Sequence, residues 1–207
     1  MSGYEHFKYD TDRETYSAAR VRALEALLVK KGVITGATVD KVLKYFKTEM
    51  GPFNGAKIVA RAWVDPAFKA RLLQDANAAI AEMKFPPGMS GAEGEHLKIV
   101  ENTAKVHNLI VCTLCSCYPW PTLGLPPYWF KDPTFRARAV REPRAVLKEF
   151  GLTIDPAVEI NVWDSSAQIR WSVLPERPQG TAKMTEAQLA AIVTPESMMG
   201  VGKIKVA

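Results

Sequence analysis

The sequence predicts an α+β fold, in which an N-terminal helical arm and helices precede an α/β sandwich-like domain that carries a metal-binding loop. Three observations lead to this prediction. The first third of the chain has apolar residues at helical spacing, and the rest holds short β-branched and apolar runs. All three cysteines lie within six residues that directly follow one of those runs. We place the domain boundary at a Pro/Gly-rich linker, which separates domains at 1–85 and 86–207.

The first domain begins with a polar and aromatic arm, which we expect to be ordered only where a partner covers it. Gly32 and Gly51 mark helix stops, and Pro66 suits the first turn of a helix. The spacing of the apolar residues predicts helices over 15–31, 38–50, 55–63 and 67–83.

The second domain mixes strands with helices. The apolar runs predict strands over 96–101, 108–111, 158–163 and 169–175, and helical spacing returns over 135–150 and 185–193. Residues 164–166, Asp-Ser-Ser, form a predicted turn. Five prolines between residues 119 and 133 predict an irregular loop that acts as a rigid lid or an interface segment.

Composition excludes several classes of function. The net charge is +5, but basic residues are scattered among acids and form no stripe with interleaved aromatics, so we expect no nucleic-acid binding. No run of about 18 apolar residues exists, which predicts no membrane span. The polar start lacks the apolar core of a signal peptide, so a cytoplasmic protein is expected.

The cysteines are the most informative residues. An odd, clustered set cannot form a disulfide framework and is more typical of metal binding or redox chemistry. A structural zinc site needs a fourth ligand, and a redox Cys-x-x-Cys pair leaves Cys117 unexplained. Any one cysteine alone could be a core residue. Three in six residues indicate a transition-metal site formed by Cys112, Cys115 and Cys117.

The spacing of the cysteines also predicts a geometry. If the sulfurs of Cys115 and Cys117 hold one ion, the amide nitrogens of Ser116 and Cys117 complete a square N2S2 plane. Cys112 supplies a third sulfur, and the sixth position stays open for catalysis. Loss of an amide proton favours Co(III) or low-spin Fe(III), and square-planar donors also suit Cu(II) and Ni(II), all over zinc. We expect one such metal per chain, activating water against a small polarised substrate.

The segment Val-Cys-Thr-Leu-Cys-Ser-Cys-Tyr-Pro-Trp-Pro at 111–121 resembles the metal-binding signature of the nitrile hydratase alpha subunit. The resemblance extends over most of the chain, because further segments also match. These are 123–127, 136–138, 140–144, 162–166, 175–178 and 198–201.

This resemblance implies hydration of a small nitrile to an amide. It implies that Cys112 is an axial thiolate, and that Cys115 and Cys117 are oxidised to sulfinic and sulfenic acid. The nucleophile is then either a metal-activated water or the oxygen on Cys117. Thr113 and Tyr118 match the cobalt branch, so Co(III) is expected, with Fe(III) as the alternative. The family also implies an activator protein for metal loading and a beta subunit, in one chain or two, whose arginines hold the oxidised sulfurs.

The resemblance adds Trp120 and Arg170 to Cys115, Ser116 and Cys117 as candidate catalytic residues. Trp120 resembles a residue that lines the substrate pocket, and ordinary core packing is the alternative. Arg170 resembles an arginine that supports the metal loop, and a weak surface ion pair is the alternative.

One feature departs from the family. Many members place a glutamine shortly before the cluster, and residues 86–111 contain none. The polar residues nearest that region are Ser90, Glu93, Glu95 and His96. We assign no ligand role to His96 or His107.

Two other functions compete with nitrile hydration. The metal subunit of thiocyanate hydrolase resembles this chain and carries the same cysteine motif, but it tends to have Arg where this chain has Trp120. A non-enzymatic subunit for metal storage or scaffolding is the third possibility, and an open coordination position argues against it.

Overall fold

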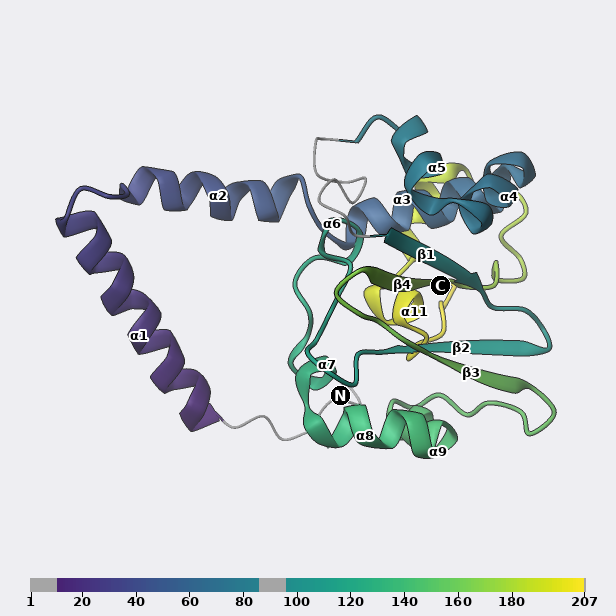
Figure 1. Cartoon of the computed structure of the whole chain (residues 1–207). Coiled ribbons are helices and arrows are strands. Elements are labelled where there is room, and N and C mark those ends of the chain that lie inside the picture. The colour runs from purple at the N-terminus through teal and green to yellow at the C-terminus, as the bar shows by residue number, and fades with distance from the viewer. Residues whose placement is uncertain (1–10, 86–95, 207) are drawn as a thin grey trace. The chain divides into compact units, whose positions relative to one another are not determined.

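The computed structural model describes residues 11–85 and 96–206. These residues fall into two compact units, 11–49 and 50–206, and each unit is described by itself. The predicted boundary at residue 86 stays a prediction. Figure 1 colours the chain from its N-terminus to its C-terminus and labels the helices and strands.

The smaller unit contains helices α1 (Thr11–Lys30) and α2 (Gly36–Thr48), which confirms the first two predicted helices. Gly32 has a φ of 69° and ends the first of them, as expected of a glycine stop. The apolar residues of α1, among them Val21, Leu24 and Leu27, are exposed in this chain. The unit therefore presents an apolar helix surface rather than a core.

The larger unit begins with α3 (Pro52–Val64), α4 (Pro66–Gln74) and α5 (Ala76–Glu82). The single helix predicted over 67–83 is wrong, because the chain breaks at Asp75. This residue is extended, and its side chain accepts a hydrogen bond from the backbone N–H of Ala78. An aspartate that caps a new helix in this way competes with continuation of the old one.

The four predicted strands are confirmed as β1 (His96–Glu101), β2 (Val106–Val111), β3 (Glu159–Asp164) and β4 (Ile169–Leu174). In the described residues they form two two-stranded parallel sheets, β1 with β4 and β2 with β3. Residues 164–166 thus link strands of different sheets. Within the second pair, Val111 lies opposite Asp164, so the two strands end together.

The proline-rich segment is not irregular, which corrects the prediction for 119–133. It contains two short helices, α6 (Trp120–Leu123) and α7 (Tyr128–Lys131). Proline is compatible with the first turn of a helix, where its missing N–H has no partner to lose.

The helix predicted over 135–150 is two helices, α8 (Pro133–Arg141) and α9 (Pro143–Glu149). The break falls at Glu142, since the ring of Pro143 disfavours a helical conformation in the residue before it. The closing helix is confirmed as α10 (Glu186–Ile192), capped by Thr185, and α11 (Pro195–Met199) follows it.

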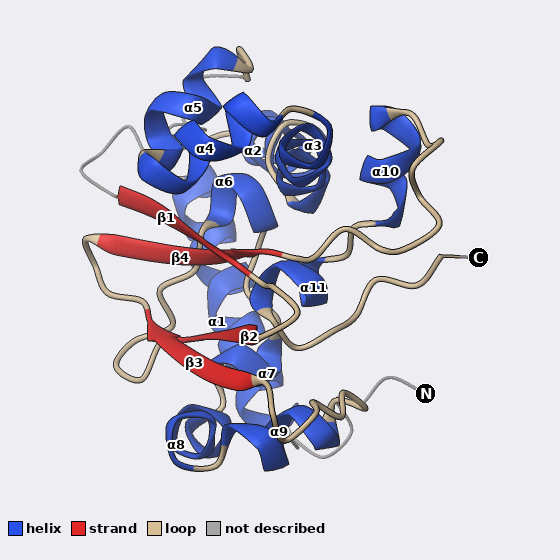
Figure 2. Cartoon of the chain, turned by 90° about the vertical axis from the view of Figure 1, so that its right-hand side faces the viewer, coloured by secondary structure: helices blue, strands red, loops and turns tan. Residues whose placement is uncertain are grey.

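Helices cover the two sheets of the larger unit. Figure 2 shows α3, α4 and α5 on the side of β1 and β4, and α8 and α9 on the side of β3. Contacts of α4 and α5 with β1, and of α9 with β3, agree with this view. The core includes Leu109 and Ile110 of β2 and the aromatic rings of Phe130 and Phe135, all of them completely buried. Strand β2 therefore runs through the centre of the core.

The C-terminal segment is anchored against β2. Gly200 has a φ of 81°, and a Cβ at this position would lie 1.9 Å from the carbonyl oxygen of Asn108. Only glycine allows so close an approach of two backbones. Over the described residues, no helix has both the length and the apolar character needed to cross a membrane.

Candidate metal centre

The cysteine loop begins where β2 leaves the core. Five consecutive residues of this strand are buried, and Cys112, the next residue, is completely buried as well. The backbone N–H of Ser165 donates to the carbonyl oxygen of Val111 at 2.7 Å, which extends the contact between β2 and β3 by one residue. The first cysteine therefore directly follows a buried strand that is hydrogen-bonded to its neighbour up to its last residue.

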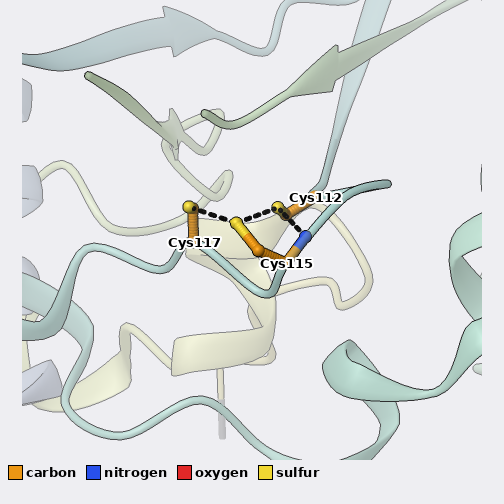
Figure 3. A group of neighbouring side chains, drawn as sticks. All are labelled: Cys112, Cys115 and Cys117. Atoms are coloured by element: carbon orange, nitrogen blue, oxygen red, sulfur yellow. Dashed lines mark hydrogen bonds between the residues drawn. The ribbon is translucent and has the colours of Figure 1, made fainter. Parts of the chain in front are cut away.

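The loop brings the three sulfurs together (Figure 3). The Sγ atoms of Cys112 and Cys115 are 3.5 Å apart, and those of Cys115 and Cys117 are 2.7 Å apart. All three lie within 4.8 Å of one another. Cys112 is buried, Cys117 is half-buried and Cys115 is exposed, so the group opens toward the surface.

Backbone amides converge on the buried sulfur. The N–H groups of Cys115 and Ser116 donate to Cys112 Sγ at 3.3 and 3.1 Å. Ser116 has a φ of 92°, a conformation that residues other than glycine rarely adopt. Strained backbone of this kind persists where the surrounding structure imposes it, commonly at functional sites.

The pKa values of the Cys112 and Cys117 thiols are shifted in opposite directions. Burial raises the pKa of the Cys112 thiol, but the backbone N–H groups of residues 114–117 outweigh burial and lower that pKa to about 7. Burial, together with the hydrogen bond to Cys115, raises the pKa of Cys117 to about 12, against the charge of Arg170, which lowers it. Cys112 is thus the sulfur best prepared to be a thiolate.

These donors fit a transition metal. Three sulfurs from one short segment suit a soft or borderline ion, and the inward amides place nitrogen beside sulfur. In the part of the chain that the structure describes, the group consists of the three cysteines and includes no histidine or carboxylate. It therefore lacks the fourth side-chain ligand of a closed structural zinc site.

Arg170 and Trp120 flank the loop. Arg170 lies on β4, and its Nη1 donates to the carbonyl oxygen of Ser166. Its positive charge opposes the larger effects of burial and the Cys115 hydrogen bond, which raise the pKa of the Cys117 thiol. Trp120 opens α6, three residues beyond Cys117, and its side chain is 45% exposed. Tyr118, by contrast, is buried and packs edge to face on Phe130, with ring centroids 5.1 Å apart.

The two described histidines lie apart from the sulfur group. His107 is buried, and its Nε2 donates to the carbonyl oxygen of Gly200 at 2.7 Å. Burial lowers the pKa of His107, so the neutral ring is favoured. His96 is exposed at the start of β1. The other polar residues named in place of the absent glutamine, Ser90, Glu93 and Glu95, lie outside the described residues.

Asp164 contacts the cysteine loop, which the sequence did not predict. The backbone N–H of Thr113 donates to Asp164 Oδ1 at 2.9 Å, and Thr113 Oγ1 donates to Oδ2 at 2.5 Å. The sequence places Asp164 in a predicted turn and in a segment, 162–166, that resembles the family, but it indicates no contact with the cysteines. Its position directly after a β-rich run was the available signal, because side chains at the ends of parallel strands commonly form sites.

A cavity of about 490 Å³ adjoins this contact. It is lined by Thr113, Pro133, Arg136, Ala137, Val140 and Arg141.

Comparison with known proteins places this loop in a family. The family described as "Nitrile hydratase, alpha chain" matches residues 15–202. A low-molecular-weight cobalt-containing nitrile hydratase subunit alpha from Rhodococcus rhodochrous is 59% identical, over 89% of this chain and 87% of its own length. Thiocyanate hydrolase subunit gamma from Thiobacillus thioparus is 39% identical, over 86% of this chain and 76% of its own length.

A solved structure agrees with these relatives. A double mutant of the Fe-type nitrile hydratase from Comamonas testosteroni Ni1 superposes with a TM-score of 0.82 at 40% identity, covering 95% of this chain and 92% of that one. The chain belongs to the nitrile hydratase alpha-chain family.

Proposed function

We propose that this chain is the metal-carrying alpha subunit of a nitrile hydratase, which adds one water to a small nitrile to give the corresponding amide. The observation that carries the proposal is the sulfur group of Cys112, Cys115 and Cys117, with backbone amides directed at its buried member. The family match supports the reaction.

The proposed cofactor is one trivalent cobalt ion per chain. The three cysteine sulfurs and the amide nitrogens of Ser116 and Cys117 would hold it. The bound ion supplies Lewis acidity, which polarises a nitrile or lowers the pKa of water. The Rhodococcus rhodochrous relative is named as cobalt-containing, which supports cobalt. The Comamonas testosteroni protein is named as Fe-type, so Fe(III) is the alternative.

The protein residues have separate proposed roles. Cys115 and Cys117 carry added oxygens as sulfinic and sulfenic acid, and Cys112 remains a thiolate. Exposure supports this division, because oxidation follows access and Cys112 is buried while Cys115 is exposed. The nucleophile toward the nitrile carbon is either the oxygen on Cys117 or a water that the metal would activate. Arg170 stabilises negative charge on Cys117, and the exposed ring of Trp120 forms part of the substrate pocket.

The proposed partner is a beta subunit, in one chain or two, that covers the cysteine loop and supplies arginines to the oxidised sulfurs. Support comes from apolar side chains exposed on and after this loop, since such a group of residues commonly marks an interface. They include Leu114, Trp120, Leu125, Tyr128 and Val140, with Leu114 86% exposed. We further propose loading by an activator protein, a cytoplasmic location, and no role for nucleic acid or membrane.

Thiocyanate hydrolysis is the second candidate, because the Thiobacillus thioparus relative is 39% identical. Its substrate also contains a polarised carbon–nitrogen triple bond. Trp120 favours nitrile hydration, since an indole suits an uncharged organic nitrile better than an anion.

Co-expression with the neighbouring gene products in cobalt-containing medium tests the proposal. We expect about one cobalt per chain, amide formation from a panel of small nitriles and no release of carbonyl sulfide from thiocyanate. Carbonyl sulfide without amide would instead establish the second candidate. A purified complex that holds stoichiometric zinc and forms neither product would refute both.

A further inference from the structure

One face of α8 lines the cavity beside the cysteine loop. Arg136 and Val140 are four residues apart, and so are Ala137 and Arg141, which places all four on the same side of the helix. Thr113, the residue after Cys112, belongs to the same lining. The cavity therefore joins a helix face with two cations to the loop of the candidate metal centre.

The two arginines of this cavity have no acidic partner in the part of the chain that the structure describes. Arg136 makes no hydrogen bond or ion pair there, and its Nε is buried without an acceptor. Arg141 donates only from its Nε, to the carbonyl oxygen of Ala137 at 3.2 Å. A guanidinium stays charged in proteins, and a buried donor without an acceptor costs free energy. An anion in the cavity would remove this cost.

The acidic residues closest along the chain are already engaged. Asp132 caps the start of α8 and accepts two backbone N–H groups. Glu142 and Glu149 both bind Arg138, at 2.7 and 2.5 Å. Asp164 accepts two hydrogen bonds from the cysteine loop. Helix α8 thus has one arginine that is paired twice within the chain and two arginines, both at the cavity, whose charges are left for an external group.

The size and the surroundings of the cavity indicate what kind of group this is. Its volume of about 490 Å³ exceeds that of a single carboxylate and is in the range of sites that take larger ligands. Its walls also include apolar side chains. Val140 is 51% exposed, and Leu114, the neighbour of Thr113, is 86% exposed. Exposed apolar residues beside unpaired charges are typical of a protein interface, so an acidic segment of a protein fits better than a small free anion.

We propose that this cavity is a docking site for the beta partner, which inserts an acidic side chain whose carboxylate pairs with Arg136 and Arg141. The inference rests on the proposed function and deepens it, because it gives the proposed interface a specific contact. No hydrogen bond within the described residues fixes the Arg136 side chain, so its guanidinium can turn toward the carboxylate. Two parallel N–H groups of a guanidinium match the two oxygens of a carboxylate.

Variants of the complex, produced by co-expression with the neighbouring gene products, test this docking site. Arg136→Gln and Arg141→Gln each remove one charge, while Arg136→Lys keeps the charge and loses the planar fork. Lys148→Gln is the matched control, because Lys148 is an exposed cation on α9 that does not line the cavity. The readout is the rate at which the alpha chain leaves its partner, measured at several salt concentrations by exchange with labelled unmodified alpha chain.

We expect Arg136→Gln to speed dissociation at least about 30-fold, because removal of one member of a buried charge pair acts mainly on the dissociation rate. Arg141→Gln should have a smaller effect at its exposed position and should mainly reduce the dependence on salt. Arg136→Lys should lie between Arg136→Gln and the unmodified chain. Lys148→Gln should resemble the unmodified chain.

Carbodiimide cross-linking identifies the group that occupies the cavity. The reagent condenses an amine with a carboxylate, whereas a guanidinium does not react. The complex with Arg136→Lys should therefore give a cross-link from position 136 to an aspartate or glutamate of the partner, identified by mass spectrometry of the peptides. The unmodified complex should give none at this position.

Unchanged dissociation in both Arg136→Gln and Arg141→Gln would overturn the inference. A cross-link from position 136 to a carboxylate of the same chain, or none to the partner, would overturn it too. If Arg136→Gln fails to fold, Arg141→Gln and the cross-link carry the test. An unmodified complex that holds together but binds no cobalt and forms no amide would instead contradict the proposed function, and the dissociation rates would still decide the docking site.

Discussion

The two parallel strand pairs of the larger unit end in different kinds of chemistry. At the end of β2 and β3 lie Cys112, which follows β2, and Asp164, the last residue of β3. Beyond β1 and β4 lie Asn102 and Pro175, beside another cavity of about 490 Å³. Carboxyl ends of parallel strands are common positions for sites, so both ends are candidates by topology.

The polar groups at the β1–β4 end already bind one another. Asn102 accepts the backbone N–H of Asn108 at 2.8 Å, and His107 donates to the carbonyl oxygen of Gly200. Arg177 donates to the carbonyl oxygens of Trp63 and Thr181 at 3.2 and 2.8 Å. These bonds tie the C-terminal segment and α3 to the sheets.

At the β2–β3 end, three sulfurs instead lie within 4.8 Å of one another, and two backbone amides donate to the buried one. Equal cavity volume and equal topology therefore do not identify a site. The difference between the two ends is whether their donors and acceptors are used up within the chain. We therefore expect substitutions at the β2–β3 end to change the chemistry and substitutions at the β1–β4 end to change the stability.

The largest expected effect is that of Cys117→Ser. The serine keeps the size of the side chain but cannot be oxidised to a sulfenic acid, so it removes the proposed base or nucleophile. We expect kcat to fall at least about a thousandfold even where cobalt is retained. Steady-state kinetics paired with elemental analysis of the same sample measure both. Near-normal kcat with bound cobalt would show that the oxygen on Cys117 has no role in the reaction.

Cys115→Ala should remove turnover through loss of the metal. This variant deletes the sulfur that lies between the other two, 3.5 and 2.7 Å from them. Fewer thiolate ligands weaken binding of a soft or borderline ion. We expect cobalt well below stoichiometric, measured by elemental analysis after dialysis. Full occupancy in the alanine variant would mean that Cys115 is not a ligand.

His107→Ala should lower stability and leave the chemistry in place. The substitution removes a buried ring and its hydrogen bond to Gly200, at a cost of about 2 to 3 kcal/mol in the free energy of unfolding. Urea unfolding measures the cost, and the folded variant should retain cobalt and measurable turnover. His96→Ala is the control, since this exposed side chain should change stability by less than about 0.5 kcal/mol. Loss of cobalt from folded His107→Ala would make His107 part of the metal centre.

The smallest expected effect is on the pH dependence of stability. Burial lowers the pKa of His107 below its ordinary value of 6.5, so the unfolded chain binds the proton first as pH falls. The contribution is fully present above about pH 6.5 and decreases below it, by at most about 1.4 kcal/mol per pH unit. The free energy of unfolding, measured between about pH 7.5 and pH 5.5, should depend on pH with a slope that His107→Ala reduces. An identical slope in the variant would assign the dependence to other groups.

Local pattern predicted most of the secondary structure. Apolar spacing located the helices and strands, because each depends on neighbouring residues along the chain. It failed where a single residue ended an element. Asp75 divides one predicted helix by capping the next, and Pro143 divides another through the residue before it. Local pattern also cannot predict the pairing of β2 with β3 or of β1 with β4, because parallel pairing joins residues far apart in sequence.

The sequence by itself determined the donor set, because Cys112 and the Cys115-Ser116-Cys117 tripeptide are close enough along the chain for their sulfurs to meet in one loop. Only the tertiary structure decided what surrounds these donors. Asp164 is 51 residues from Thr113 and reaches it through the register of the strands. His107 is 93 residues from Gly200, whose carbonyl oxygen accepts a hydrogen bond from the histidine ring. Chelation by adjacent residues is a local property, whereas orientation and satisfaction of polar groups depend on which distant segments the fold brings together.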